Sequence, residues 1–199
     1  MATKPAQKRA LARAKKQPIV AARNMAVHSQ ALTRLVREGA LERVARGTYR
    51  VADTPVSEHH AFAVVAAVAP RSVICLLSAL TFHGVGTQLP FEVWVAIERG
   101  TRPPALRNPP LRVVRMSGES FKAGIETHVI DGRKVRVYSV AKTIADLFKF
   151  RNRIGVDVAI EALRDAWQRR LVTVDEIDRH ARICRVDRVM RPYLEALLA

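Results

Sequence analysis

The most constraining feature of this chain is a change in the spacing of apolar residues within residues 29–51. The first half repeats them at helical spacing, at Ala31, Leu32, Leu35 and Val36. Gly39 follows, and glycine readily adopts the left-handed conformation that ends many helices. The second half has the composition of two short strands around Ala45-Arg46-Gly47, which is typical of a β-hairpin. The segment therefore predicts an amphipathic helix followed at once by a hairpin.

The predicted helix has a polar and basic face opposite its apolar one. Five side chains that can donate hydrogen bonds to bases or phosphates share this face: Ser29, Gln30, Thr33, Arg34 and Arg37. The hairpin adds three arginines, Arg43, Arg46 and Arg50. A solvated helix of any small domain would show the same period, but here the helix, the hairpin and the net charge agree. We therefore predict a DNA-binding winged helix-turn-helix over residues 1–55.

Positive charge is concentrated near the start of the chain. The 199 residues include 34 Lys and Arg against 18 Asp and Glu, a formal net charge of +16. Residues 1–56 hold 12 of these cations and only three acidic residues, so their charge density is more than three times that of the other 143 residues. A genome rich in arginine codons would raise basicity throughout, and it does not explain this asymmetry. The excess favours a polyanionic partner.

The residues before the predicted recognition helix indicate further helical structure. Residues 4–16 are rich in alanine and helix-prone, and their lysines and arginines form either a phosphate-contacting arm or a solvated face. A short helix is expected from Ile19 to about Met25, with Ala26-Val27-His28 as the turn. This turn lacks the usual glycine and capping residue, which leaves Ser29 as the candidate N-cap.

The break at Ala52-Asp53-Thr54-Pro55 marks the predicted domain boundary. Residues 56–199 are expected to form a mixed α/β domain in which helices wrap a small sheet, so that the whole chain is α+β. We predict helices over residues 58–68, 70–84, 139–148, 155–170, 173–180 and 188–198. Strands are predicted over residues 91–97, 111–115, 127–130 and 135–138.

Long cations and aromatic residues in the second domain suggest a partner surface. The cations are Lys142, Lys149, Arg151, Arg153 and Arg164. They are interleaved with Phe148, Phe150 and Trp167, and aromatics with arginine are enriched at protein interfaces. The alternative is that the aromatics belong to the core and the cations form its solvated edge. Periodicity leaves both interpretations open.

A metal-dependent nuclease is the enzymatic alternative. Asp157, Glu161 and Asp165 share one helical face, although Arg164 and Arg169 lie close enough to pair with them. The chain has no phosphate-binding loop and no metalloprotease or serine hydrolase motif. His59-His60 diverge by about 100° on a helix, which does not favour shared metal ligation. We therefore expect no enzyme activity, no catalytic residues, no metal and no cofactor.

Two further features concern the compartment. Cys75 and Cys184 lie far apart in apolar surroundings and are expected to be buried thiols of a reducing compartment. No apolar run approaches the roughly 18 residues of a membrane span, and the N-terminus lacks a signal-peptide core. We expect a cytoplasmic protein without a membrane partner.

Several separated motifs, in this order, resemble the AbiEi-type antitoxins of type IV toxin–antitoxin systems. They are LTRLVREGALERVARGTYRV, ICLLSALTFHGV, TQLPFEVWVAI, VYSVAKTIADLFKFRNRIGVDVAIEALRDAW and CRVDRVMRPYLEAL, within residues 17–199. The resemblance implies that the winged helix binds inverted repeats in its own promoter and represses the operon. It also implies that the C-terminal domain counteracts a nucleotidyltransferase toxin.

The same resemblance assigns roles to the candidate residues. Those of the helix would enter the major groove of double-stranded DNA, and the three hairpin arginines would hold flanking phosphates. Solitary relatives without a toxin partner can carry this architecture. A winged-helix transcription factor with a sensing domain is therefore a second possibility beside the nuclease.

Overall fold

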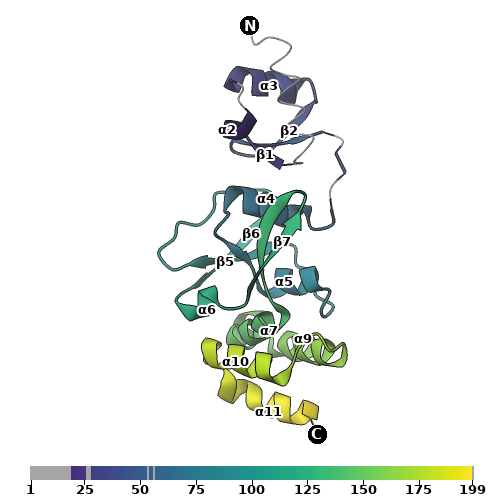
Figure 1. Ribbon diagram of the computed structural model, residues 1–199, viewed down its shortest axis with the longest axis vertical. Coiled ribbons are helices and arrows are strands. Elements are labelled where there is room, and N and C mark those ends of the chain that lie inside the picture. The colour runs from purple at the N-terminus through teal and green to yellow at the C-terminus, as the bar shows by residue number, and fades with distance from the viewer. Residues whose placement is uncertain (1–18, 26–27, 53, 56, 199) are drawn as a thin grey trace. The chain divides into compact units, whose positions relative to one another are not determined.

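The computed structural model describes residues 19–25, 28–52, 54–55 and 57–198 (Figure 1). The chain divides into two compact units. The first comprises residues 1–71 together with 104–111 and 127–135, and the second comprises the remainder. The helix predicted over residues 4–16 and the turn at Ala26-Val27 lie outside the described residues. The boundary near residue 55 stays a prediction.

A three-stranded antiparallel sheet and two helices begin the first unit. The strands are β1 (Ile19–Ala21), β2 (Leu41–Ala45) and β3 (Thr48–Val51), in the order β1-β3-β2. The helices are α2 (Ala22–Met25) and α3 (Ser29–Arg37). The helix predicted from Ile19 is wrong in its first half, because β1 pairs with β3, about 30 residues later. The element order is compatible with a winged helix-turn-helix.

Helix α3 is amphipathic as predicted. Its Leu32 and Leu35 pack in a small core with Val20, Met25, Leu41 and Val51. The helix ends before Gly39, which has a φ of +70°, and Ala40 N–H donates to the Leu35 carbonyl. At the other end the N-cap is His28, whose side chain makes no capping hydrogen bond. The assignment of Ser29 as N-cap is therefore wrong, because Ser29 is already the first helical residue.

Helix α4 and the turn end of a later hairpin also belong to the first unit. Helix α4 (His60–Val68) packs against β1 and β2. The hairpin consists of β7 (Ile125–Ile130) and β8 (Arg133–Tyr138), joined by Asp131-Gly132 as predicted. Both turn residues have positive φ, +47° and +71°, a conformation that Asp tolerates and Gly adopts freely.

The second sheet has five strands in the order β6-β5-β4-β8-β7 and includes the hairpin of β7 and β8. Its remaining strands are β4 (Val73–Ile74), β5 (Val93–Glu98) and β6 (Leu111–Met116). Central β4 runs antiparallel to β5 and parallel to β8. The helix predicted over residues 70–84 is therefore wrong at its start. Val73 and Ile74 pair with β5, Ile74 also pairs with β8, and α5 (Leu76–His83) begins only afterwards.

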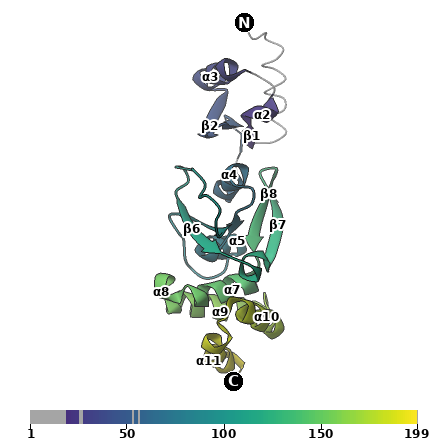
Figure 2. The same ribbon diagram turned by 90° about the vertical axis from the view of Figure 1, so that its left-hand side faces the viewer.

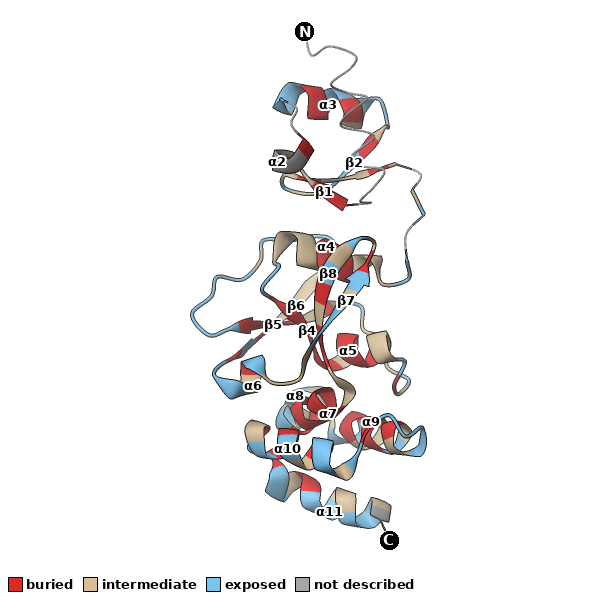
Figure 3. Cartoon of the chain, viewed as in Figure 1, coloured by how far each residue is buried: buried red, intermediate tan, exposed pale blue. Residues whose placement is uncertain are grey.

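Helix α6 (Glu119–Lys122) lies between β6 and β7. The helices described after β8 are α7 (Val140–Lys149), α8 (Arg151–Ile154), α9 (Val156–Gln168), α10 (Val174–Cys184) and α11 (Asp187–Leu198). Figure 2 shows these helices from a second direction. Helix α7 packs against α5, α9 and α10, and eight consecutive residues from Ala141 to Phe148 are buried (Figure 3). Thr173 and Glu176 form the predicted capping box of α10. The mixture of helices and two small sheets confirms the predicted fold class.

Candidate nucleic-acid interface

The candidate face of α3 lies in solvent. All five predicted residues, Ser29, Gln30, Thr33, Arg34 and Arg37, are exposed, whereas Ala31, Leu32 and Leu35 are buried beneath them. The Thr33 hydroxyl donates to the Ser29 carbonyl at 3.1 Å, so this hydroxyl is engaged within the helix. The remaining four side chains project from one side of a short helix. An exposed helix face of this kind fits the major groove of B-DNA.

The two arginines of α3 differ in their surroundings. Arg34 Nε lies 2.7 Å from Glu38 Oε1, in a pair whose side chains are 68% and 47% exposed. Arg37 makes no ion pair within the described residues. Because the Arg34–Glu38 pair is exposed, little energy opposes its opening when a phosphate or base arrives.

The three arginines of the β2–β3 hairpin differ in exposure. Arg43 on β2 and Arg46 at the turn are exposed, and Gly47 completes the turn with a φ of +69°. Arg50 on β3 is largely covered, and its Nε lies 2.6 Å from Glu42 Oε2 on the paired strand. This hydrogen bond lowers the pKa of Glu42. Arg43 and Arg46 can therefore reach a ligand directly, while Arg50 braces the hairpin.

Two acidic residues of the interface were not identified from the sequence. Glu38 lies four residues after Arg34 on a helix, so its pairing could have been predicted from spacing. Glu42 meets Arg50 only because of the β2–β3 register. Each carboxylate lowers the net positive charge around the candidate arginine with which it pairs.

Lys142 does not belong to an exposed partner surface. Its side chain is fully buried, with Nζ 2.5 Å from Asp146 Oδ2 and 4.2 Å from the centre of the Tyr138 ring. The physical reason is that neighbouring helices pack around α7, so its polar positions also face the core. Lys142 must therefore be removed from the predicted surface.

The other residues of that surface are distributed between core and solvent. Phe148 is buried, and Phe150 and Trp167 are half-buried, which favours the alternative that the aromatics are core. Arg151 is half-buried and donates to the Phe148 carbonyl at 2.9 Å. The exposed cations are Lys149, Arg153 and Arg164. Their role in binding a partner stays a prediction.

A buried polar network surrounds the Lys142–Asp146 pair. Cys184 Sγ donates to Asp146 Oδ1 at 3.2 Å. Burial raises the pKa of the Cys184 thiol to about 11, so the thiol remains protonated and able to donate at neutral pH. Burial also raises the pKa of Asp146, although the Lys142 ammonium opposes this. Cys75 and Cys184 are both buried free thiols, as predicted.

Asp165, on the acidic face of α9, has a structural role. Asp165 Oδ2 accepts a hydrogen bond from Gly86 N–H at 2.8 Å and lies 3.2 Å from Arg169 Nη1. Arg169 Nη1 also donates to the Gly84 carbonyl. Asp165 and Arg169 thus attach the loop after α5 to α9. Asp157, Glu161 and Asp165 line a shallow hollow of about 530 Å³, which Arg164 shares.

The adjacent histidines do not act together. His60 Nδ1 lies 2.6 Å from Asp131 Oδ2, whereas His59 Nε2 lies 3.2 Å from Glu58 Oε1. Across the residues that the structure describes, no three His, Cys, Asp or Glu side chains gather closely enough to hold a metal ion.

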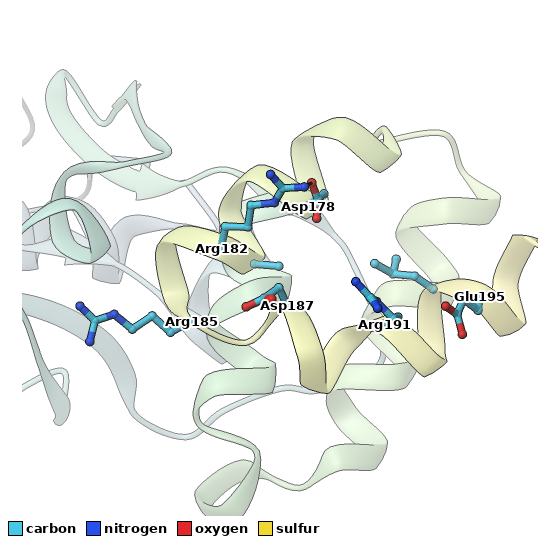
Figure 4. A pocket seen from close by; sticks show the side chains of 8 residues that line it. Asp178, Arg182, Arg185, Asp187, Arg191 and Glu195 are labelled. Carbon is cyan, nitrogen blue, oxygen red and sulfur yellow. Dashed lines mark ion pairs between the residues drawn. The ribbon is translucent and has the colours of Figure 1, made fainter.

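A pocket between α10 and α11 was not predicted from the sequence (Figure 4). Its volume is about 430 Å³, and charged side chains form most of its lining: Asp178, Arg182, Arg185, Asp187, Arg191 and Glu195. Arg182 Nη2 pairs with Asp178 Oδ2 at 2.7 Å. The acidic and basic residues balance each other. Only the packing of two helices brings them together, so sequence patterns could not reveal this pocket.

No helix within the described ranges is both long enough and apolar enough to cross a membrane. The chain is similar in fold to the RV2827C protein from Mycobacterium tuberculosis, with a TM-score of 0.64 and 12% sequence identity. The similarity covers 88% of this chain and 71% of that one. At this identity it concerns the fold alone.

Among curated proteins, none matches the sequence. Residues 20–52 match a family described as "Transcriptional regulator, AbiEi antitoxin". This span contains all eight candidate DNA-binding residues. Over residues 20–52 the chain therefore matches the AbiEi family of antitoxins and transcriptional regulators, which confirms over that span the resemblance predicted from the sequence.

Proposed function

We propose that this protein is a DNA-binding transcriptional repressor of its own operon and the antitoxin of a type IV toxin–antitoxin system. Residues 1–55 bind promoter inverted repeats as a winged helix-turn-helix. Residues 56–199 counteract a nucleotidyltransferase toxin. The family match over residues 20–52 supports the regulatory role and the antitoxin role together.

The exposed face of α3 is the observation that carries the DNA-binding proposal. Arg34 and Arg37 project from the same side as Ser29 and Gln30, above a buried apolar side. Arginine donates two parallel hydrogen bonds to guanine, and glutamine can do the same to adenine. No acidic residue lies in the first turn of α3, so nothing there repels a phosphate at the positive end of the helix.

The hairpin supplies contacts of a different kind. Arg43 and Arg46 are exposed on the strand and turn that follow α3, and α3 packs against β2. Their role is to hold phosphates, which adds affinity without sequence preference. Two copies on an inverted repeat require half-sites one helical turn apart, or a multiple of it.

The DNA-binding proposal is tested with the full chain and the duplex immediately upstream of its own gene. Wild-type protein should bind this duplex more tightly than a scrambled duplex of equal length in fluorescence anisotropy. Arg34→Ala/Arg37→Ala should weaken specific binding by about tenfold or more, since each base contact contributes about 1–3 kcal/mol. Arg164→Ala/Arg170→Ala, on the exposed surface of the second unit, is the matched control. Equal affinities for both duplexes would contradict the proposal.

The antitoxin role needs a separate experiment. Co-expression with the neighbouring nucleotidyltransferase gene should restore growth of cells that the toxin arrests. Arg34→Ala/Arg37→Ala should lose repression of a promoter reporter while keeping this rescue. If the double variant loses rescue at the same protein level, the proposed division between DNA binding and neutralisation is wrong.

A solitary transcription factor with a sensing domain is a second candidate. The pocket between α10 and α11 favours it, because a cavity of about 430 Å³ with balanced charges could accept a small zwitterionic ligand. A chain that represses its promoter and has no toxin gene beside it would support this candidate. Growth rescue from a neighbouring toxin would instead support the antitoxin.

A further inference from the structure

The hairpin of β7 and β8, close to its turn, contacts β1, the first strand that the structure describes. Arg133 Nε donates to the Ile19 carbonyl at 2.9 Å, and Arg133 Nη2 donates to the same oxygen. Ile19 has no exposed surface, so this carbonyl is shielded from water. The two residues are 114 positions apart in sequence and lie in the same compact unit.

The same turn also holds the start of α4. Asp131 Oδ1 accepts a hydrogen bond from Ser57 N–H at 3.2 Å, and Asp131 Oδ2 lies 2.6 Å from His60 Nδ1. The Asp131 side chain is only 7% exposed. Burial by itself raises the pKa of Asp131, but the hydrogen bonds from His60 and Ser57 outweigh it and lower the pKa. The carboxylate is thus a buried acceptor shared by two donors near the helix.

These contacts reach the candidate interface through β1 and α4. Ile19 pairs with Arg50 in the β1–β3 ladder, and Val20 packs in the same small core as Leu32 and Leu35 of α3. Helix α4 packs against both β1 and β2. Arg133 therefore holds β1, which shares a core with α3 and pairs with β3. Asp131 holds the start of α4, which packs against β1 and β2.

We infer that Asp131 and Arg133 are positioning residues for DNA binding, so that the DNA-binding unit is completed by a hairpin turn from much later in the chain. Without the two Arg133 bonds, the buried Ile19 carbonyl lacks these donors and β1 is less firmly held. The unit then populates several arrangements of α3 relative to the β2–β3 hairpin, and only one of them is competent to bind DNA. This inference rests on the proposed function and adds two residues to it.

The expected effect is a lower population of the binding-competent arrangement. Apparent affinity falls in proportion to that population. Losing two hydrogen bonds from a half-buried, charged guanidinium to a buried carbonyl should weaken binding of the upstream duplex by about tenfold in Arg133→Ala. Lys134→Ala is the matched control, because Lys134 is the exposed neighbouring residue on the same strand. It should bind within about twofold of wild type, as expected for a surface substitution.

A stoichiometric titration separates positioning from misfolding. At a duplex concentration far above the dissociation constant, the titration counts competent molecules in the full-length protein. Arg133→Ala should bind one equivalent per site with the same endpoint as wild type, while its dissociation constant rises. A reduced endpoint with an unchanged dissociation constant would show that Arg133 serves folding only, and would overturn the inference.

Asp131→Asn provides a second variant. Asparagine tolerates the positive φ of this turn and retains an acceptor for Ser57 N–H, but it removes the charge beside His60. A smaller loss of affinity than in Arg133→Ala is expected. Wild-type affinity in both variants would overturn the inference.

Hydrogen exchange distinguishes failure of this inference from failure of the proposed function. Amides of residues 19–21 and 48–51 should exchange faster in Arg133→Ala than in wild type or Lys134→Ala, whether or not DNA binds. Wild type could bind the native and scrambled duplexes equally while exchange is still faster in Arg133→Ala. The proposed function then fails and the packing role of Arg133 stands. Unchanged exchange would overturn the packing role itself.

Discussion

Helices α3 and α7 contain the same local motif in opposite surroundings. Each has a basic residue four positions before an acidic one, Arg34 with Glu38 at the end of α3 and Lys142 with Asp146 within α7. The first pair is 2.7 Å apart and largely exposed. The second is 2.5 Å apart and has no exposed side-chain surface. Sequence spacing alone assigns both pairs to a helix surface.

The difference shows which helix can bind a ligand and which stabilises the fold. Exposed ion pairs of this spacing contribute only about 0.3–0.5 kcal/mol, so their side chains remain available to a partner. A buried pair is different, because removing one member leaves an uncompensated charge in the core. Helix α3 keeps its charged residues on one exposed side, whereas α7 is surrounded by packed helices.

The largest expected effect comes from breaking the buried pair. Lys142→Ala should lower the free energy of unfolding of the second unit by about 3–5 kcal/mol, since Asp146 then lacks its counter-charge. Chemical denaturation followed by tryptophan fluorescence measures this directly, because Trp94 and Trp167, the only two tryptophans, both lie in that unit.

A double variant controls for the loss of side-chain volume. Lys142→Met/Asp146→Leu removes both charges and keeps apolar atoms in the core. Its stability should lie close to that of wild type or above it. If Lys142→Ala were as stable as wild type, the contrast between the two helices would be mistaken.

Substitutions at the N-caps of α7 and α3 should change stability by an intermediate amount. Ser139 caps α7 by accepting a hydrogen bond from the backbone N–H of Lys142, so Ser139→Ala should lower the free energy of unfolding by about 1 kcal/mol in the same denaturation assay.

His28 occupies the N-cap position of α3 in a suitable extended conformation without a capping bond. His28→Ser should therefore slow hydrogen exchange in α3, and faster exchange would count against the assigned cap.

The smallest effect is expected for Glu38. Glu38→Gln removes the exposed partner of Arg34, so the free energy of unfolding should change by less than about 0.5 kcal/mol. Affinity for DNA should rise by roughly twofold to fivefold at low salt, because one negative charge leaves the binding face. Anisotropy at two salt concentrations measures the change. A drop in affinity would mean that the Arg34–Glu38 pair orients Arg34 for binding.

Local patterns predicted those features that depend on nearby residues. The amphipathic α3, the β2–β3 hairpin, the Asp131-Gly132 turn and the capping box of α10 all appear as expected. Each depends on residues within a few positions of one another. Five of the eight candidate interface residues follow from the helical spacing of α3 and three from the hairpin composition, and seven of the eight are exposed.

Features that depend on distant partners were not predictable in this way. Ile19–Ala21 and Val73–Ile74 are strands because of neighbours from elsewhere in the chain, although their local composition suggested helices. The burial of Lys142 follows from the helices packed around α7. The contact of Arg133 with Ile19 joins residues 114 positions apart, which no local pattern encodes.

The most direct test of α3 as a recognition helix compares two arginines by specificity. The ratio of dissociation constants for the scrambled and native upstream duplexes should fall about tenfold in Arg37→Ala, because a base contact is lost. In Arg46→Ala that ratio should stay constant while the salt slope decreases by roughly 0.9, as for one phosphate contact. A constant ratio in Arg37→Ala, with native stability, would contradict the assignment of α3 to the major groove.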